Sequence, residues 1–242
     1  MFNTSEINQL INQSYALFST YSFGNIVAVH HGNCCLSHED AVLLKTTPVK
    51  EINRRLIYEY LDASEDHDQH ALALQIKYLL PRILDLLVKD EYIHHSAECI
   101  LDKCRFNLSA VWKDQEIEFM NRFALCFFRL KILVFDDTDQ VDSYLIMFHK
   151  GGLNIQPLLD EWLKHLHISN ALLNLLYILY YHFDQGVYRQ SFADEKLIQL
   201  MQNWANKLRN NEIFVTAIID VLTSNTIYCQ YQYIIESVFE EL

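Results

Sequence analysis

Glycine and proline are scarce in this chain, and that scarcity constrains its fold more than any other feature. Only 5 Gly and 3 Pro occur among its 242 residues. β-Sandwiches and β-barrels use both residue types in their many turns, so the scarcity favours long helices joined by tight connections. Hydrophobic residues make up 51% of the chain, which is enough to build a sizeable core and keep the chain ordered.

Apolar residues recur with helical spacing along most of the sequence, and no segment shows a convincing alternation with a period of two. We predict about a dozen helices, each roughly 9 to 20 residues long. They lie within residues 5–20, 37–45, 48–63, 64–91, 96–104, 115–135, 136–152, 157–167, 169–186, 194–209, 212–224 and 230–242.

The short connections between these segments imply that neighbouring helices are antiparallel. We therefore expect an all-α fold of antiparallel helix pairs, either an irregular bundle or a short, HEAT-like α-solenoid without a strict repeat. Residues 1–242 are expected to form a single helical domain. The Gly151–Gly152 pair offers a break into two lobes, residues 1–150 and 153–242, and Pro81 should kink or divide its helix.

The net charge of the chain limits the kinds of partner that it can bind. The formal net charge is −12, from 31 acidic and 19 basic residues, and it repels a phosphate backbone, so we expect no nucleic-acid binding. An acidic surface keeps a protein soluble, and it can also attract a basic protein partner. The N-terminal stretch lacks a secretory signal, and the longest apolar runs are interrupted or fall short of the ~20 residues that a bilayer span needs. We expect a cytoplasmic protein without membrane contact.

The densest set of potential metal ligands lies in "VAVHHGNCCLSHED", residues 27–40. The spacing of His31, Cys34, Cys35 and His38 could surround a zinc ion. Adjacent cysteines point their side chains apart, however, so both could bind one metal only in a tight local turn. The alternative is a loop whose thiols pack against the first helices. We expect no cofactor, with zinc at this cluster as the alternative.

The remaining histidines and cysteines give weaker signals. We interpret His94 and His95, which precede Ser96, as solvated residues at a helix start. The acidic stretch "EDHDQH" around His67 and His70 resembles a binding site for divalent cations. It lacks the glycine that forms the sharp turn of a calcium-binding loop. The isolated cysteines lie in apolar contexts and are interpreted as small buried hydrophobic residues in a reducing compartment.

"YLLPRILDLL", residues 78–87, resembles the "FLPRILEL"-like helix of a functionally uncharacterised bacterial family. The similarity extends through "EYIHHSAECILDKC" and "WKDQEIEFMNRFALCFF" and covers roughly residues 25–130. The resemblance implies an all-helical fold, but it indicates no biochemical mechanism. Members of such families separate the cysteines of the loop, whereas this chain has the adjacent pair. Within the motif, Arg82 can pair with Asp85, which lies three residues further along the helix.

The chain contains no nucleophile elbow, P-loop, dinucleotide fingerprint or zincin motif. We therefore expect a non-enzymatic protein-interaction module, most concretely an immunity or antitoxin-like protein that binds and occludes a basic toxin domain. Residues 210–242 contain no Lys or Arg. The expected partner-binding residues there are Glu212, Asp220, Tyr231, Glu236, Glu240 and Glu241.

Other interpretations of the same residues stay open. The acidic residues of the C-terminal segment can be an ordinary solvated helix face. Tyr228, Tyr231 and Ile235 have the spacing of a core stripe. A metal-dependent enzyme or zinc-stabilised protein using residues 30–38 and a purely structural helical scaffold are the alternative functions.

Overall fold

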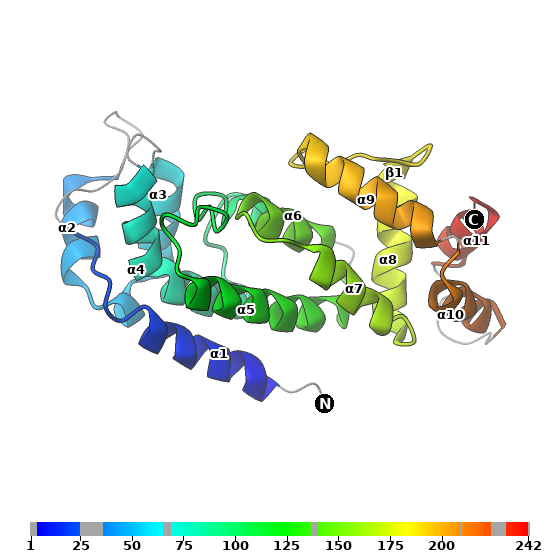
Figure 1. Cartoon of the computed structure of the whole chain (residues 1–242), viewed down its shortest axis with the longest axis horizontal. Coiled ribbons are helices and arrows are strands. Elements are labelled where there is room, and N and C mark those ends of the chain that lie inside the picture. Colours follow the sequence, from blue (N-terminus) through cyan, green and yellow to red (C-terminus); the bar gives the residue numbers. More distant parts are fainter. Residues whose placement is uncertain are drawn as a thin grey trace. The chain divides into compact units, whose positions relative to one another are not determined.

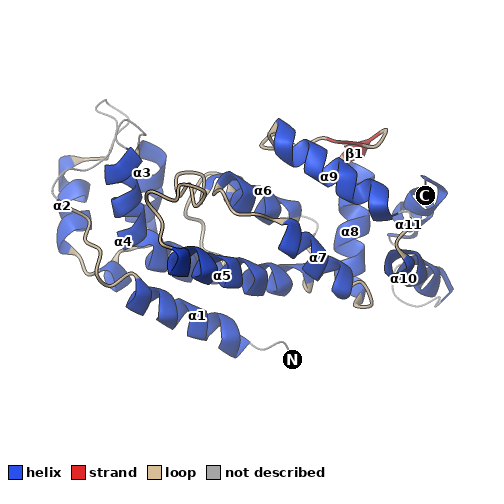
Figure 2. Cartoon of the chain, viewed as in Figure 1, coloured by secondary structure: helices blue, strands red, loops and turns tan. Residues whose placement is uncertain are grey.

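The computed structural model describes residues 4–24, 36–64, 69–136, 140–208, 210–223 and 231–241, and helices dominate them (Figure 2). These ranges contain eleven α-helices, two short 3-10 helices and one two-stranded hairpin. The expectation of an all-α fold is confirmed. None of the helices within these ranges is both long and apolar enough to cross a membrane.

The elements follow one another along the chain with mostly short connections (Figure 1). The α-helices are α1 (Thr4–Leu17), α2 (His38–Thr46), α3 (Arg54–Ala63), α4 (Gln69–Val88), α5 (Asp114–Ile132), α6 (Asp142–Lys150), α7 (Gln156–Lys164), α8 (Ser169–Tyr181), α9 (Glu195–Leu208), α10 (Glu212–Thr223) and α11 (Gln232–Glu241). The short elements are the 3-10 helices η1 (Val49–Glu51) and η2 (Ala97–Cys99) and the strands β1 (Phe183–Asp184) and β2 (Val187–Tyr188).

The chain forms two compact units. The first comprises residues 1–127 with 150–153, and the second comprises residues 128–149 with 154–242. Helix α5 contributes residues to both units, and the segment around the glycine pair belongs to the first. The expected single domain, and its division into lobes of residues 1–150 and 153–242, stay predictions.

Helix α4 forms the core of the first unit, where it packs against α1, α3 and η1. Its residues Ile76, Leu79, Leu80, Ile83 and Leu84 are fully buried. The helix continues through Pro81, so of the two expected outcomes the division does not occur, and the kink stays a prediction. Arg82 pairs with Asp85 as expected, at 2.6 Å, and its Nε donates a hydrogen bond to the carbonyl oxygen of Ile52 at 2.7 Å.

Two predicted helices of the first unit are interrupted. The segment over residues 48–63 divides into η1 and α3, because the Asn53 side chain accepts a hydrogen bond from the Leu56 N–H and starts a new helix. The segment over residues 96–104 forms only the three-residue η2 and turns. By contrast, α2 begins within the predicted segment 37–45, and Ser37 caps it by accepting from the Asp40 N–H at 3.0 Å.

Helix α8 is central to the second unit and packs against α11 and β1. Its residues Ala171, Leu172, Leu173, Leu175, Leu176 and Ile178 are buried, as its nearly all-apolar sequence predicts. The small β1–β2 hairpin was not expected. Gln185 and Gly186 connect its strands and both have positive φ angles, which are typical of a tight hairpin turn.

Candidate functional site

The predicted zinc cluster is largely outside the described residues. His31, Cys34 and Cys35 belong to residues 25–35, which the structure does not describe. His38 is the first residue of α2, and it is exposed. The zinc alternative at this cluster therefore stays a prediction.

The predicted partner-binding residues are partly described. Glu212 and Asp220 are exposed on α10, and Glu236 is exposed on α11. Tyr231 is half-buried, and its ring packs edge-on against Phe135 with centroids 5.1 Å apart. The side chains of two further residues lie outside the described part of the chain: Glu240 and Glu241.

A cluster of tyrosines lies beside these residues in the second unit. Tyr177, Tyr180 and Tyr181 occupy the last turns of α8 with a spacing that places them on neighbouring positions of one face. Tyr233 comes from α11, which packs against α8. We call these four residues the tyrosine cluster. Two helices that are distant in the sequence are needed to assemble it.

The rings of the tyrosine cluster contact one another directly. The hydroxyl oxygens of Tyr181 and Tyr233 are 2.7 Å apart and share a hydrogen bond. The ring centroid of Tyr181 lies 4.4 Å from that of Tyr177 and 4.8 Å from that of Tyr180, and the Tyr180 and Tyr233 centroids lie 5.6 Å apart. The hydrogen bond to Tyr233, together with burial, raises the pKa of Tyr181 to about 12. Tyr181 is therefore neutral at physiological pH.

The tyrosine cluster is largely open to solvent. Tyr180 is 38% exposed, and Tyr181 and Tyr233 are each 48% exposed. Glu236 follows Tyr233 by three residues, so its carboxylate lies on the same exposed side of α11. Exposed aromatic faces next to a carboxylate can bind a guanidinium or ammonium group, because both attract positive charge.

The helices around the tyrosine cluster carry no basic side chains, and α10 and α11 carry acidic ones. The sequences of α8, α10 and α11 contain no Lys or Arg. Helix α10 also exposes apolar surface, since Ile219 is 45% and Leu222 is 38% exposed. These two residues are three positions apart and share a helix face. Exposed aromatic and apolar side chains are enriched at protein interfaces, and acidic groups beside them complement a basic partner.

Sequence reasoning missed the tyrosine cluster. The segment "YILYY" ends a nearly all-apolar helix, a pattern that favours burial, whereas Tyr180 and Tyr181 are exposed. The available signal was the placement of aromatic hydroxyl groups at neighbouring helical positions. The partner residue Tyr233 could not be identified, because its contact depends on how α11 packs on α8.

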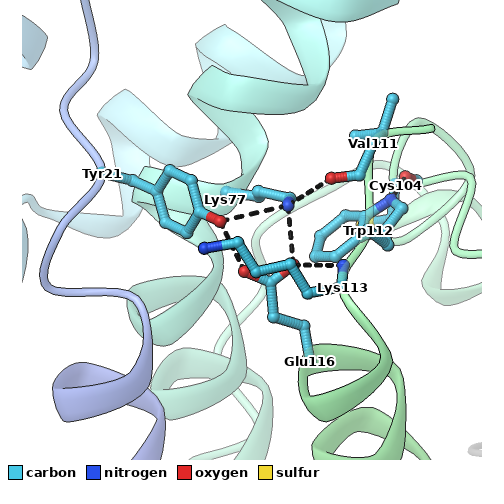
Figure 3. A network of polar contacts seen from close by, with 7 residues as sticks. All are labelled: Tyr21, Lys77, Cys104, Val111, Trp112, Lys113 and Glu116. Carbon is cyan, nitrogen blue, oxygen red and sulfur yellow. Dashed lines mark hydrogen bonds and ion pairs between the residues drawn. The ribbon is translucent and has the colours of Figure 1, made fainter. Parts of the chain in front are cut away.

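A second group of polar side chains lies inside the first unit (Figure 3). The ammonium group of Lys77 donates hydrogen bonds to the Val111 carbonyl oxygen at 2.5 Å, to Glu116 Oε2 at 2.6 Å and to the Tyr21 hydroxyl oxygen at 3.3 Å. The Tyr21 hydroxyl in turn donates to Glu116 Oε1 at 2.5 Å. The ammonium also lies 4.7 Å from the centroid of the Trp112 ring.

This network is saturated, and its chemistry is that of a structural clamp. All three protons of the Lys77 ammonium have an acceptor, and Glu116 accepts a further hydrogen bond from the Lys113 N–H at 2.9 Å. Burial alone raises the pKa of Glu116, but the hydrogen bonds from Lys77 and Tyr21 outweigh burial and lower it. A saturated lysine has no proton or lone pair to offer a substrate.

Comparison of the chain with protein-family models, with curated proteins and with solved structures finds no match. The resemblance of residues 78–87 to a bacterial family therefore stays a prediction.

Proposed function

We propose that this protein is a non-enzymatic protein-binding module that uses the tyrosine cluster and Glu236 to bind a basic protein partner. The observation that carries this proposal is the exposed Tyr181–Tyr233 pair, joined at 2.7 Å and flanked by a carboxylate. Large aromatic side chains dominate the energetics of protein interfaces because they cover much area at a low cost in conformational entropy.

The tyrosine cluster is prearranged for binding. Contacts between its rings restrict their motion before a partner arrives, so less entropy is lost in the complex. The hydrogen bond between the two hydroxyl groups still leaves lone pairs that can accept from a partner. An arginine or lysine side chain can therefore contact ring faces, hydroxyl oxygens and the Glu236 carboxylate together.

Charge supports a basic partner. The chain has a net charge of −12, and residues 210–242 hold five acidic residues and no Lys or Arg. Such a field speeds the encounter with a positively charged protein and disfavours acidic competitors. The most concrete version of the proposal is an immunity or antitoxin-like protein that occludes a basic toxin domain.

The proposal can be tested by site-specific photocrosslinking in cells of the source organism. A benzophenone amino acid replaces Tyr181 in one variant and Tyr92 in a control variant. Tyr92 is a suitable control because it is 60% exposed and belongs to the first unit. We expect one basic protein to be crosslinked from position 181 and not from position 92.

Two results would contradict the proposal. One is an acidic protein crosslinked at position 181. The other is the same crosslinked proteins at both positions, which indicates random encounters. Mass spectrometry of the crosslinked species distinguishes these outcomes, and the identity of a basic partner shows whether it is a toxin.

A further inference from the structure

Three side chains that commonly bind metals meet in the first unit, in the segment that follows α4. His94, His95 and Cys99 each offer one ligand atom, and these atoms lie within 4.8 Å of one another. The imidazole rings of His94 and His95 have centroids 4.1 Å apart. Ligands of a tetrahedral zinc ion lie roughly 3.3–3.8 Å apart, given bonds of about 2.0–2.3 Å. A small closing movement would therefore complete the geometry.

His94 contributes an unusual polar atom to this cluster. The residue is only 6% exposed, so its interpretation as a solvated histidine at a helix start is wrong. Its Nδ1 atom is buried and has no hydrogen-bond partner within the described part of the chain. Buried polar atoms nearly always have a partner, and one without it calls for an explanation such as an ion.

The surroundings of the cluster fit a metal that enters from solvent. His95 is exposed, and its Nδ1 lies 3.7 Å from a carboxylate oxygen of Asp62. Carboxylates next to ligating histidines commonly orient the ring and strengthen the ligand. Cys99 is buried, and Lys150 donates to its sulfur at 3.6 Å. A metal ion would displace this ammonium group from the sulfur.

We propose that His94, His95 and Cys99 form a binding site for a transition-metal cation, with Zn²⁺ as the best fit. Two imidazole nitrogens and one thiolate suit a borderline cation and not Mg²⁺ or Ca²⁺, which prefer oxygen ligands. Three protein ligands leave one coordination position for water. The three proposed ligands belong neither to the tyrosine cluster nor to the predicted zinc cluster of residues 31–38.

The proposal is tested by titrating the purified full chain with Co²⁺, which occupies zinc sites and reports its ligands by absorption. We expect one Co²⁺ per chain, a thiolate-to-cobalt charge-transfer band, and displacement by one equivalent of Zn²⁺. His95→Ala is the principal variant, because an exposed side chain can be removed without disturbing the core. It should weaken Co²⁺ binding by more than the roughly 10- to 100-fold that loss of a supporting hydrogen bond costs.

Two further variants locate the thiolate. Cys99→Ser should abolish the charge-transfer band, whereas the double variant Cys34→Ser/Cys35→Ser should retain it. Absence of the band in the wild-type chain would overturn the proposal. So would a band that persists in His95→Ala and disappears in Cys34→Ser/Cys35→Ser, because the metal would then be bound by the cluster around residues 31–38.

Discussion

The Lys77 ammonium nitrogen lies 2.6 Å from Glu116 Oε2, and the two side chains are only 2% and 1% exposed. A buried ion pair is costly to desolvate, and it persists when additional hydrogen bonds satisfy both partners. Tyr21 and Val111 supply these hydrogen bonds (Figure 3). The pair therefore joins α4 to the start of α5 and to the two loops that contain Tyr21 and Val111.

Removing one member of this pair should destabilise the first unit strongly. Lys77→Met leaves the Glu116 carboxylate buried beside an apolar side chain, and we expect a loss of about 3–5 kcal/mol in the free energy of unfolding at pH 7. Urea denaturation measures this loss. The double variant Lys77→Met/Glu116→Leu should recover most of it, because it removes both charges. Losses that simply add in the double variant would show that the pair is not coupled.

The same pair predicts how stability depends on pH. The pKa of Glu116 is lowered in the folded chain from its ordinary value of 4.5, because hydrogen bonds from Lys77 and Tyr21 outweigh burial. The ionised Glu116 side chain therefore contributes its full stabilisation to the folded chain above pH 4.5. This stabilisation is lost as the pH falls through the lowered pKa. Glu116→Gln should be less stable than the wild type at pH 7, and the difference should shrink below pH 4.5. A constant difference across this range, measured by urea denaturation, would contradict the assignment.

Gly152 is expected to resist substitution. Its φ angle is +92°, and an added Cβ would lie 2.8 Å from Oδ1 and 2.9 Å from the backbone nitrogen of Asn107. Gly152→Ala should lower the unfolding free energy by more than the roughly 1–2 kcal/mol of a left-handed backbone alone. Gly186→Ala is the matched control, since Gly186 has a φ of +77° but open space at its Cβ. Equal losses in thermal or urea denaturation would show that the contact with Asn107 is unimportant.

The hydroxyl pair of the tyrosine cluster can be tested by titration. The hydrogen bond to Tyr233 is the main reason why the pKa of Tyr181 is raised to about 12 from 10.0. Tyr233→Phe should return the Tyr181 pKa toward 10, as measured by NMR of ¹³C-labelled tyrosine rings up to pH 11. Tyr92→Phe should leave it unchanged. A Tyr181 that already titrates near pH 10 in the wild-type chain would rule out the pair.

Local sequence patterns predicted most helices, because apolar periodicity determines which face of a helix is buried. Helices α8, α9 and α10 lie within residues 169–186, 194–209 and 212–224, as expected. The sequence-based predictions fail where tertiary contacts determine the local backbone conformation. Residues 96–104 contain good helix formers, but the Trp112 indole donates to the Cys104 carbonyl oxygen at 2.8 Å and fixes a turn there.

The candidate sites were harder to predict than the helices. The exposed position of Glu236 followed from its helical pattern. The contact between Tyr181 and Tyr233 joins residues separated by 52 positions and depends on packing that periodicity does not specify. His94 was misinterpreted for a similar reason, because tertiary packing buries its ring, and burial lowers its pKa to about 4.

The most direct test of the account is the dissociation constant of the complex with the partner crosslinked at position 181. We expect Tyr181→Ala/Tyr233→Ala to weaken binding by about 30-fold or more, as truncation of central interface aromatics does. Tyr92→Ala should bind like the wild type. Isothermal titration calorimetry at constant ionic strength measures all three constants. An unchanged dissociation constant in the folded double variant would contradict the assignment of the tyrosine cluster as the binding surface.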